Sequence, residues 1–273
     1  MVCKEINRLL SNIKKKNYNN FLDVDNIDEK ILRDERCVEI PYSLSRYKGQ
    51  KKILEIGLCL ADTDLVETQI LLKKYCQIKL SACDIVDFSR VKNRFQNLDY
   101  DLEKEYKFTL NDIRNTIYDD SSFDFVYLIS TLEHVGFDEF VNDKNNYGVF
   151  NRSEKTPNIL PAYSECNQDI IALKELERII SKNGSLIITL PYGKRGICAL
   201  KDSLGLYSLY KEYSYDAWKK LLNSTNFKIK DESFFSFDNN SGWKKTNENL
   251  DNQKTDYSIF DPVKHIICCE LTI

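Results

Sequence analysis

Residues 52–57 read Lys-Ile-Leu-Glu-Ile-Gly, an apolar run that ends on a glycine. Two later segments repeat this design: Cys83-Asp84-Ile85 closes a second apolar run, and residues 128–136 read Leu-Ile-Ser-Thr-Leu-Glu-His-Val-Gly. Buried parallel strands carry near-continuous apolar runs, and the turns after their carboxyl ends present functional groups at one edge of the sheet. The three segments therefore predict an open α/β sheet with a ligand site along that edge.

Periodicity along the rest of the chain predicts further elements of the same fold. Helical spacing of apolar residues predicts helices over 62–75, 169–181 and 215–224, with Gly184 ending the second of them. Alternating helices and strands predict a Rossmann-like, doubly wound, seven-stranded sheet whose last strand inserts antiparallel. The predicted strands are 52–56, 78–83, 106–110, 123–130, 186–190, 227–232 and 265–273.

The chain divides into two predicted parts. Residues 1–50 form an N-terminal helical extension, in which Ile6, Leu9 and Ile13 are at helical spacing, and residues 51–273 form the ligand-binding domain. Residues 138–166 are rich in Asn, Asp, Lys and Ser. A loop of this length inside a compact domain is usually functional or disordered, so we predict an insertion on the substrate side.

Composition excludes several classes of protein. The net charge is −3, without the broad basic surface that nucleic acids require, and no apolar run is long enough to span a membrane. Nine cysteines without a Cys-x-x-Cys pair, beside two histidines, favour reduced buried thiols over zinc ligands. The sequence predicts a cytoplasmic protein that binds neither nucleic acid nor membrane.

Acidic residues close three consecutive predicted strands, and these strand ends resemble the cofactor edge of the class I S-adenosylmethionine-dependent methyltransferases. The resemblance implies the following roles. Gly57 allows a ligand to approach the backbone closely, and the carboxylate of Glu55 can organise a cationic amino-acid tail. Asp84 can accept both hydrogen bonds of a ribose diol, because an ionised carboxylate is an acceptor only. Asp112 can accept from the exocyclic amine of adenine while Ile85 or Ile113 packs on the ring, although an Asp in a turn is more often a local backbone cap.

Over residues 35–195 the chain resembles the class I S-adenosylmethionine-dependent methyltransferases. The resemblance rests on the segment Glu35-Arg36-…-Glu39-x-Pro41, on the turn Ser-Thr-Leu-Glu-His-Val-Gly at 130–136, and on Leu-Pro-Tyr-Gly at 190–193. The family's Gly-x-Gly-x-Gly loop reads Gly-Leu-Cys-Leu-Ala at 57–61, so small residues replace two of its glycines. The resemblance implies S-adenosylmethionine as cofactor. It assigns cofactor contacts to Leu58, Cys59, Ser130, Leu132 and Glu133, and acceptor contacts to His134 and Tyr192.

His134 is the predicted general base. A neutral hydroxyl is a poor nucleophile, and an imidazole with an ordinary pKa near ~6.5 can remove its proton at neutral pH. The alternative is a structural histidine that caps a helix or satisfies a buried carbonyl. For His265, at the start of the last strand, the structural role is favoured.

Other charged residues have predicted roles around the acceptor. Arg36, Glu39 and Tyr42 are predicted to close over the site from the N-terminal segment. Lys194 and Arg195 are predicted to meet an anionic group such as a nucleotide diphosphate, with a solvated surface as the alternative. We predict no metal site, because acidic residues in a polar insertion, here Asp138, Glu139 and Asp143, are more often a solvated surface.

The sequence leaves three classes of function open. The first is O-methylation of a small polar metabolite or sugar, such as a nucleotide-linked sugar in surface polysaccharide biosynthesis, with N-methylation as its variant. The second is a non-catalytic protein that binds S-adenosylmethionine. The third is a nicotinamide-dependent oxidoreductase, which the loop disfavours because Asp62 stands where the third glycine of Gly-x-Gly-x-x-Gly is needed. The acceptor atom and the oligomeric state are not predicted.

Overall fold

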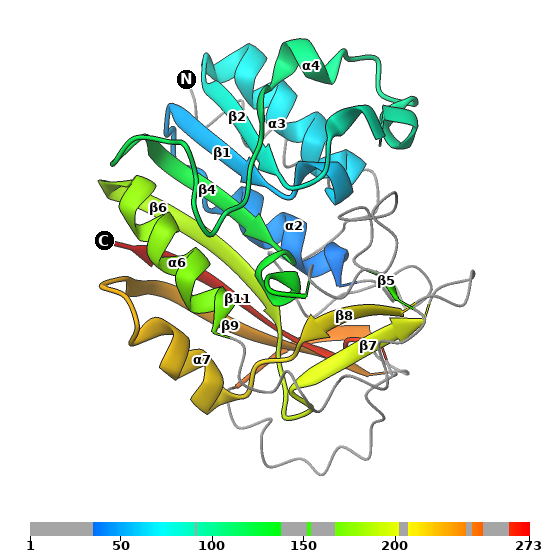
Figure 1. Ribbon diagram of the computed structural model, residues 1–273, viewed down its shortest axis with the longest axis vertical. Helices are drawn as coiled ribbons and strands as arrows, with labels where there is room; N and C mark the ends of the chain where they lie inside the picture. The colour runs from blue at the N-terminus through cyan, green and yellow to red at the C-terminus, as the bar shows by residue number, and fades with distance from the viewer. Residues whose placement is uncertain are drawn as a thin grey trace.

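The fold is a twisted α/β sheet with helices on both faces, seen in a computed structural model (Figure 1). The structure describes residues 35–90, 92–137, 152–153, 167–201, 207–238, 242–247 and 262–273. The main sheet has eight strands in the order β10-β9-β11-β6-β4-β1-β2-β3. The predicted fold class is confirmed, but the predicted number of seven strands is wrong.

Five neighbouring strands of the sheet are parallel; four match the predicted strands to within one residue at each end, whereas the fifth begins at Ile180 and not at the predicted 186. They are β1 (Lys52–Ile56), β2 (Lys79–Asp84), β3 (Lys107–Leu110), β4 (Phe123–Ile129) and β6 (Ile180–Pro191). β1 pairs in parallel with β2 and β4, and β4 pairs in parallel with β6. The carboxyl ends of these strands therefore share one edge of the sheet, as the sequence predicts.

The second half of the sheet is antiparallel and contains the additional strand. β11 (His265–Thr272) lies between β6 and β9 (Lys228–Asp238) and is antiparallel to both, which confirms the predicted orientation of the last strand. β10 (Gly242–Thr246) forms a hairpin with β9 at the edge of the sheet. It lies in a polar segment that gave no strand signal, yet Trp243 on it is completely buried.

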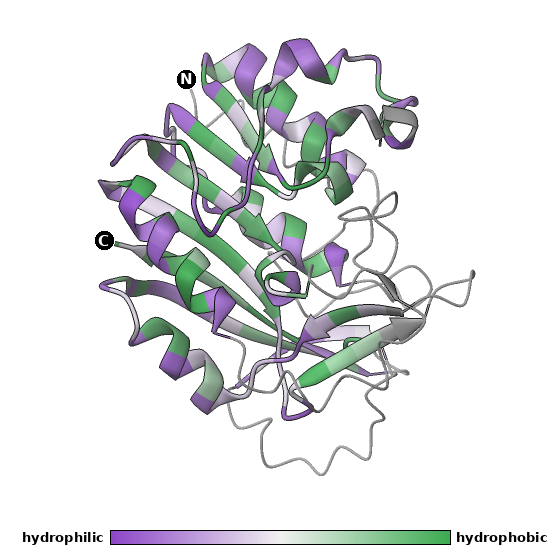
Figure 2. Ribbon diagram, in the orientation of Figure 1, coloured by the Kyte–Doolittle hydropathy of each residue, from purple (hydrophilic) through white to green (hydrophobic). Residues whose placement is uncertain are grey.

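Two hydrophobic clusters cover the two faces of the sheet. On one face α2 (Arg36–Ser45), α3 (Thr63–Cys76) and α4 (Leu102–Glu105) contribute apolar side chains, and on the other α6 (Gln168–Ile179) and α7 (Tyr215–Leu222) do so. In Figure 2 the central strands are mostly hydrophobic, whereas hydrophobic and hydrophilic residues alternate around helices α6 and α7. Burial of both faces explains the near-continuous apolar runs in the sequence.

Short 3-10 segments connect the strands and helices around the ligand edge. They are η1 (Leu58–Leu60), η2 (Phe88–Arg90), η3 (Lys92–Phe95) and η4 (Leu132–His134). A second, three-stranded sheet contains β7 (Ile197–Lys201), β8 (Tyr207–Lys211) and β5 (Arg152–Ser153). No sequence pattern predicted this small sheet.

Gly184 does not end a helix, contrary to prediction. α6 stops at Ile179, and Gly184 lies inside β6, where the pairing with β4 is irregular. β4 advances from Phe123 to Phe125 while β6 advances from Ile180 to Ser185, so the residues around Gly184 bulge from the ladder. The glycine is needed there because a Cβ would lie 3.0 Å from the carbonyl oxygen of Asp124.

Two predicted regions lie largely outside the described residues. These are residues 1–34 of the predicted N-terminal extension, and the predicted insertion 138–166 apart from β5. The described part of the extension, residues 35–50, contains α2, a mostly buried helix that packs against the sheet. No helix in the described ranges combines the length and the apolar character needed to cross a membrane.

Candidate functional site

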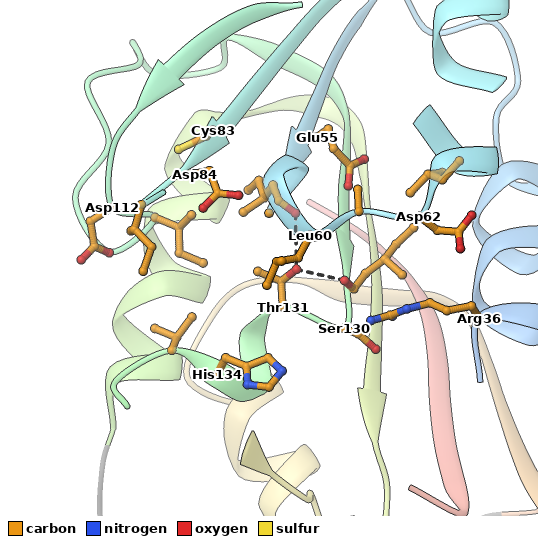
Figure 3. A pocket seen from close by; sticks show the side chains of 18 of the residues that line it. Arg36, Glu55, Leu60, Asp62, Cys83, Asp84, Asp112, Ser130, Thr131 and His134 are labelled. Carbon is orange, nitrogen blue, oxygen red and sulfur yellow. Dashed lines mark hydrogen bonds between the residues drawn. The ribbon is translucent and has the colours of Figure 1, made fainter. Parts of the chain in front are cut away.

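A cavity opens at the carboxyl edge of the parallel strands, where the turns after β1, β2, β3 and β4 meet (Figure 3). Side chains from α2 and β8 complete its wall. Nine of the predicted site residues line it: Arg36, Glu55, Gly57, Asp84, Ile85, Asp112, Ile113, Ser130 and His134. The structure thus brings together residues that are up to 98 positions apart, from Arg36 to His134.

The turns after β1 and β4 are in direct contact at Gly57. Gly57 has a φ of +85°, and its N–H donates to the carbonyl oxygen of Cys83 at 2.9 Å. A Cβ at this position would lie 2.7 Å from the hydroxyl of Thr131, which is closer than van der Waals contact permits. Only glycine satisfies both the backbone angle and the contact.

Glu55 is a buried carboxyl at the cavity wall. It accepts a hydrogen bond from the side-chain amide of Gln69, whose oxygen in turn accepts from the hydroxyl of Tyr106 at 2.6 Å. Burial raises the pKa of Glu55 to about 8, and the amide hydrogen bond opposes that rise. The side chain is therefore held in one place and is mostly neutral at pH 7 while no cation lies beside it.

Asp84 ties the turn after β2 to the turn after β1. Its Oδ2 accepts from the N–H of Cys59 and its Oδ1 from the N–H of Val86, both at 2.9 Å. Burial raises the pKa of Asp84, and these backbone hydrogen bonds oppose the rise. The carboxylate also lines the cavity, so its oxygens can accept from a ligand as well.

Asp112 lines the cavity as predicted, but its carboxylate is already engaged. Both of its oxygens accept from the guanidinium of Arg114, which also donates to Gln168. Burial opposes ionisation, yet the hydrogen bonds and the charge of Arg114 prevail and lower the pKa of Asp112. Asp112 therefore presents an ionised carboxylate whose orientation Arg114 fixes.

Ser130 connects the turn after β4 to helix α2. Its φ is +42°, a left-handed value that non-glycine residues rarely adopt. The hydroxyl of Thr189 accepts from its N–H at 3.0 Å, and its own hydroxyl donates to Glu39 at 2.7 Å. Glu39 does not line the cavity; it is fully buried and forms an ion pair with Arg36, which does.

Glu133 is buried behind the cavity and has an unusual environment. Its Oε2 has no hydrogen-bond partner. Burial and the neighbouring charge of Glu39 raise its pKa to about 8. The neutral acid is therefore the main form at pH 7.

His134 lies in η4 and faces the cavity. Its Nδ1 is 2.7 Å from the carbonyl oxygen of Leu209 in β8. Because a carbonyl only accepts, Nδ1 carries the hydrogen, and Nε2 of the neutral ring is an acceptor. Burial lowers the pKa of His134, and the hydrogen bond to Leu209 opposes that change. The structural role considered from sequence is thus present, and it leaves one nitrogen for chemistry.

The remaining predicted site residues do not line the cavity. Leu58, Cys59 and Leu132 are buried beside it. Tyr42 donates to Asp231 at 2.7 Å on the opposite side of α2, and Tyr192 is buried against Phe234. Lys194 is exposed, while Arg195 forms an ion pair with Glu212 in which both side chains are buried. These four polar side chains, which were predicted to contact the acceptor, do not line the cavity.

Sequence reasoning missed several lining residues. They are Ile40, Ile56, Leu60, Ala61, Asp62, Leu65, Cys83, Arg114, Ile129, Thr131, Val135 and Ser208. Most of them are next to predicted site residues in the sequence, so their positions could have been predicted from those residues. Asp62 could have been found as the N-cap of α3, where its side chain accepts from the N–H of Asp64. Ser208 had no signal, because it lies in the small sheet. In the described ranges, no group of three or more His, Cys, Asp or Glu side chains has a metal-binding arrangement.

Comparison with known proteins identifies the fold only. No protein-family model and no curated protein sequence matches the chain. Among solved structures, it is similar to an S-adenosylmethionine-dependent methyltransferase from Methanosarcina mazei, with 12% identity over 84% of this chain and 95% of that chain and a TM-score of 0.51. A second similar structure is 1,6-didemethyltoxoflavin-N1-methyltransferase from Burkholderia thailandensis with bound S-adenosylhomocysteine (13% identity, 98% and 88% coverage, TM-score 0.44). The first of these matches shows that the chain has the fold of such a methyltransferase.

Proposed function

We propose that this chain is an S-adenosylmethionine-dependent methyltransferase. One observation carries the proposal: carboxylates from the ends of β1, β2 and β3 and a histidine after β4 line a single cavity. The shared fold with the methyltransferase from Methanosarcina mazei supports it.

We assign lining residues to the successive parts of S-adenosylmethionine. Ile85 and Ile113 offer apolar surfaces for the adenine ring, and Asp112 lies at the same end. Asp84, an acceptor at the cavity wall, is assigned to the ribose hydroxyls. Glu55 and Gly57 are left for the amino-acid tail, where a cationic ammonium would favour the ionised form of Glu55.

The chain's own residues would orient the acceptor and take its proton. When bound, the cofactor supplies a methyl group on a sulfonium, and transfer to an acceptor oxygen breaks the C–S bond and forms a C–O bond. The hydroxyl proton goes to Nε2 of His134, which the Leu209 carbonyl holds in the required tautomer. Alignment of the acceptor behind the methyl group is the larger task.

We propose a hydroxyl of a small polar metabolite or sugar as the acceptor, and surface polysaccharide biosynthesis as the setting. We assign the acceptor to the part of the lining that includes His134, Val135 and Ser208, which would supply a base, a hydroxyl and an apolar side chain. A protonated amine acceptor would also need a base, so N-methylation remains the variant to test. Incubation with radiolabelled methyl donor and panels of sugars, nucleotide sugars and amines would distinguish the two.

Calorimetric titration tests the class of function. We expect S-adenosylmethionine and S-adenosylhomocysteine to bind and NAD to give no heat. Binding of NAD alone would overturn the proposal in favour of an oxidoreductase. Binding of S-adenosylmethionine without methyl transfer to any member of the panels would favour the non-catalytic alternative.

A further inference from the structure

Arg36 lies at the end of the cavity opposite Asp112. Figure 3 shows its guanidinium reaching from α2 toward Ser130, on the same side as Glu55. In the part of the chain that the structure describes, the other arginine that lines the cavity is Arg114, and it is bound to Asp112. The positive charge of Arg36 is therefore at the end where the amino-acid tail would lie, away from the adenine end.

Buried contacts hold Arg36 in position. Its Nη1 is 2.5 Å from Oε2 of Glu39, and the other carboxylate oxygen of Glu39 accepts from the hydroxyl of Ser130 at 2.7 Å. Glu39 is fully buried, while the Arg36 side chain keeps 28% of its surface exposed. The guanidinium is thus oriented by groups behind it and presented to the cavity, so that little entropy is lost when a ligand binds.

Arg36 and Glu55 together present a guanidinium and a carboxyl group to one ligand, and an ammonium beside Glu55 would favour its ionised form. Burial raises the pKa of Glu55 to about 8, and the positive charge of Arg36 is one of the influences that oppose the rise. An α-amino acid carries an ammonium and a carboxylate on the same carbon. A carboxyl from β1 and a guanidinium from α2 match this pair, and a planar guanidinium can hold a carboxylate through two parallel hydrogen bonds.

We infer that Arg36 binds the α-carboxylate of the cofactor's amino-acid tail, and not the acceptor. The inference rests on the proposed function, because it assigns one contact of the same ligand. Glu39 and Ser130 act through Arg36 as positioning residues. The resulting site selects an α-amino acid tail over adenosyl ligands that lack the carboxylate.

Two ligands separate this role from others. We would measure by calorimetry the dissociation constants of S-adenosylmethionine and of decarboxylated S-adenosylmethionine, which lacks only the carboxylate. For Arg36→Ala we expect binding of the former to weaken 10- to 100-fold and binding of the latter to change less than 3-fold. Arg36→Lys, which keeps the charge without the planar fork, should give an intermediate loss. Arg178→Ala is the matched control, because Arg178 pairs with Asp120 and Glu175 outside the cavity.

Loss of Arg36 leaves the buried carboxylate of Glu39 without its ion pair, so folding needs its own check. The double variant Arg36→Ala/Glu39→Gln removes both charges and keeps a side-chain oxygen for Ser130, and its melting temperature is measured beside its affinities. Equal weakening of both ligands, or unchanged affinity for both, would overturn the inference while leaving the proposed function intact. If the unmodified protein binds neither ligand, the proposed function itself fails.

Discussion

At the scale of single residues, His134 combines a structural contact with a free nitrogen. His134→Ala should lower turnover at saturating substrates by about 10²- to 10⁴-fold, the usual contribution of a general base, and should change the dissociation constant of S-adenosylmethionine little. His265→Asn is the matched control, because His265 is the second histidine of the chain and does not line the cavity. Unchanged turnover in His134→Ala would remove it from the mechanism.

The same residue predicts a pH profile. Burial lowers the pKa of His134 below its ordinary value of 6.5, so the ring stays neutral and able to accept a proton at neutral pH. Turnover should therefore be flat around pH 7 and fall only as the pH drops through a pKa below 6.5. A loss of turnover centred above pH 7 would indicate another base.

Glu133 predicts a stability effect that depends on pH. Its pKa rises from 4.5 to about 8 on folding, so its stabilising contribution is complete below 4.5 and is lost as the pH rises through 8. Arg36 and Glu39 are the charged neighbours that modulate it. Glu133→Gln imitates the neutral acid, so relative to the unmodified protein it should gain roughly 3 to 4 kcal/mol of unfolding free energy between pH 5 and pH 8.

Urea denaturation at pH 5, 6, 7 and 8 measures that difference. Asp99→Asn, at an exposed carboxyl, is the control and should show almost no change across the series. A Glu133→Gln difference that is constant with pH would mean that the carboxyl is ionised in the folded protein throughout this range.

At the scale of elements, the turns after β1 and β4 form one unit because Gly57 contacts Thr131. Gly57→Ala should be compared with Gly196→Ala, since both glycines have a positive φ but a Cβ at 196 meets nothing within 4 Å. Gly196→Ala should cost only about 1 to 2 kcal/mol for the left-handed backbone. Gly57→Ala should cost more in unfolding free energy and should also weaken cofactor affinity. If Gly57→Ala and Gly196→Ala change the unfolding free energy equally and change the cofactor affinity equally, Thr131 moves aside to make room for the Cβ at position 57.

Elements built from local pattern were predictable, and those built from distant partners were not. β1 has its predicted bounds because an apolar run flanked by Lys and Gly specifies a buried strand on its own. β7 and β8 were missed because short, mixed segments become strands only by pairing with each other. Gly184 was misread because a glycine after a helix and a glycine in a bulge look alike in sequence.

The candidate site divides in the same way. The rule that parallel strands end at one edge was enough to gather Glu55, Asp84, Asp112 and His134. The partners that define their chemistry come from elsewhere: Leu209 reaches His134 from the small sheet. The prediction for Tyr192 followed from a motif, but the motif's tyrosine packs against Phe234 in the core.

At the scale of the whole molecule, the cavity and the antiparallel edge are far apart in the sheet. Trp243 on β10 is completely buried and packs against Phe237, with ring centroids 5.6 Å apart. Trp243→Ala should reduce the unfolding free energy by about 3 to 5 kcal/mol. Because β9, β11, β6 and β4 separate β10 from β1, S-adenosylmethionine affinity should not change. A parallel loss of affinity, measured by calorimetry below the melting temperature, would show that the two regions are coupled.

The position of β11 affects how the protein is made. Its partners β6 and β9 do not pair with each other, so among the residues that the structure describes, residues 265–272 alone join the parallel strands to the β9–β10 hairpin in the sheet. While a ribosome is still adding these residues, the growing chain can assemble β3-β2-β1-β4-β6 but leaves the rim of β6 open. Completion of the sheet must therefore wait until translation has passed Thr272, and during that interval the nascent chain offers an unpaired strand to chaperones or to neighbouring copies.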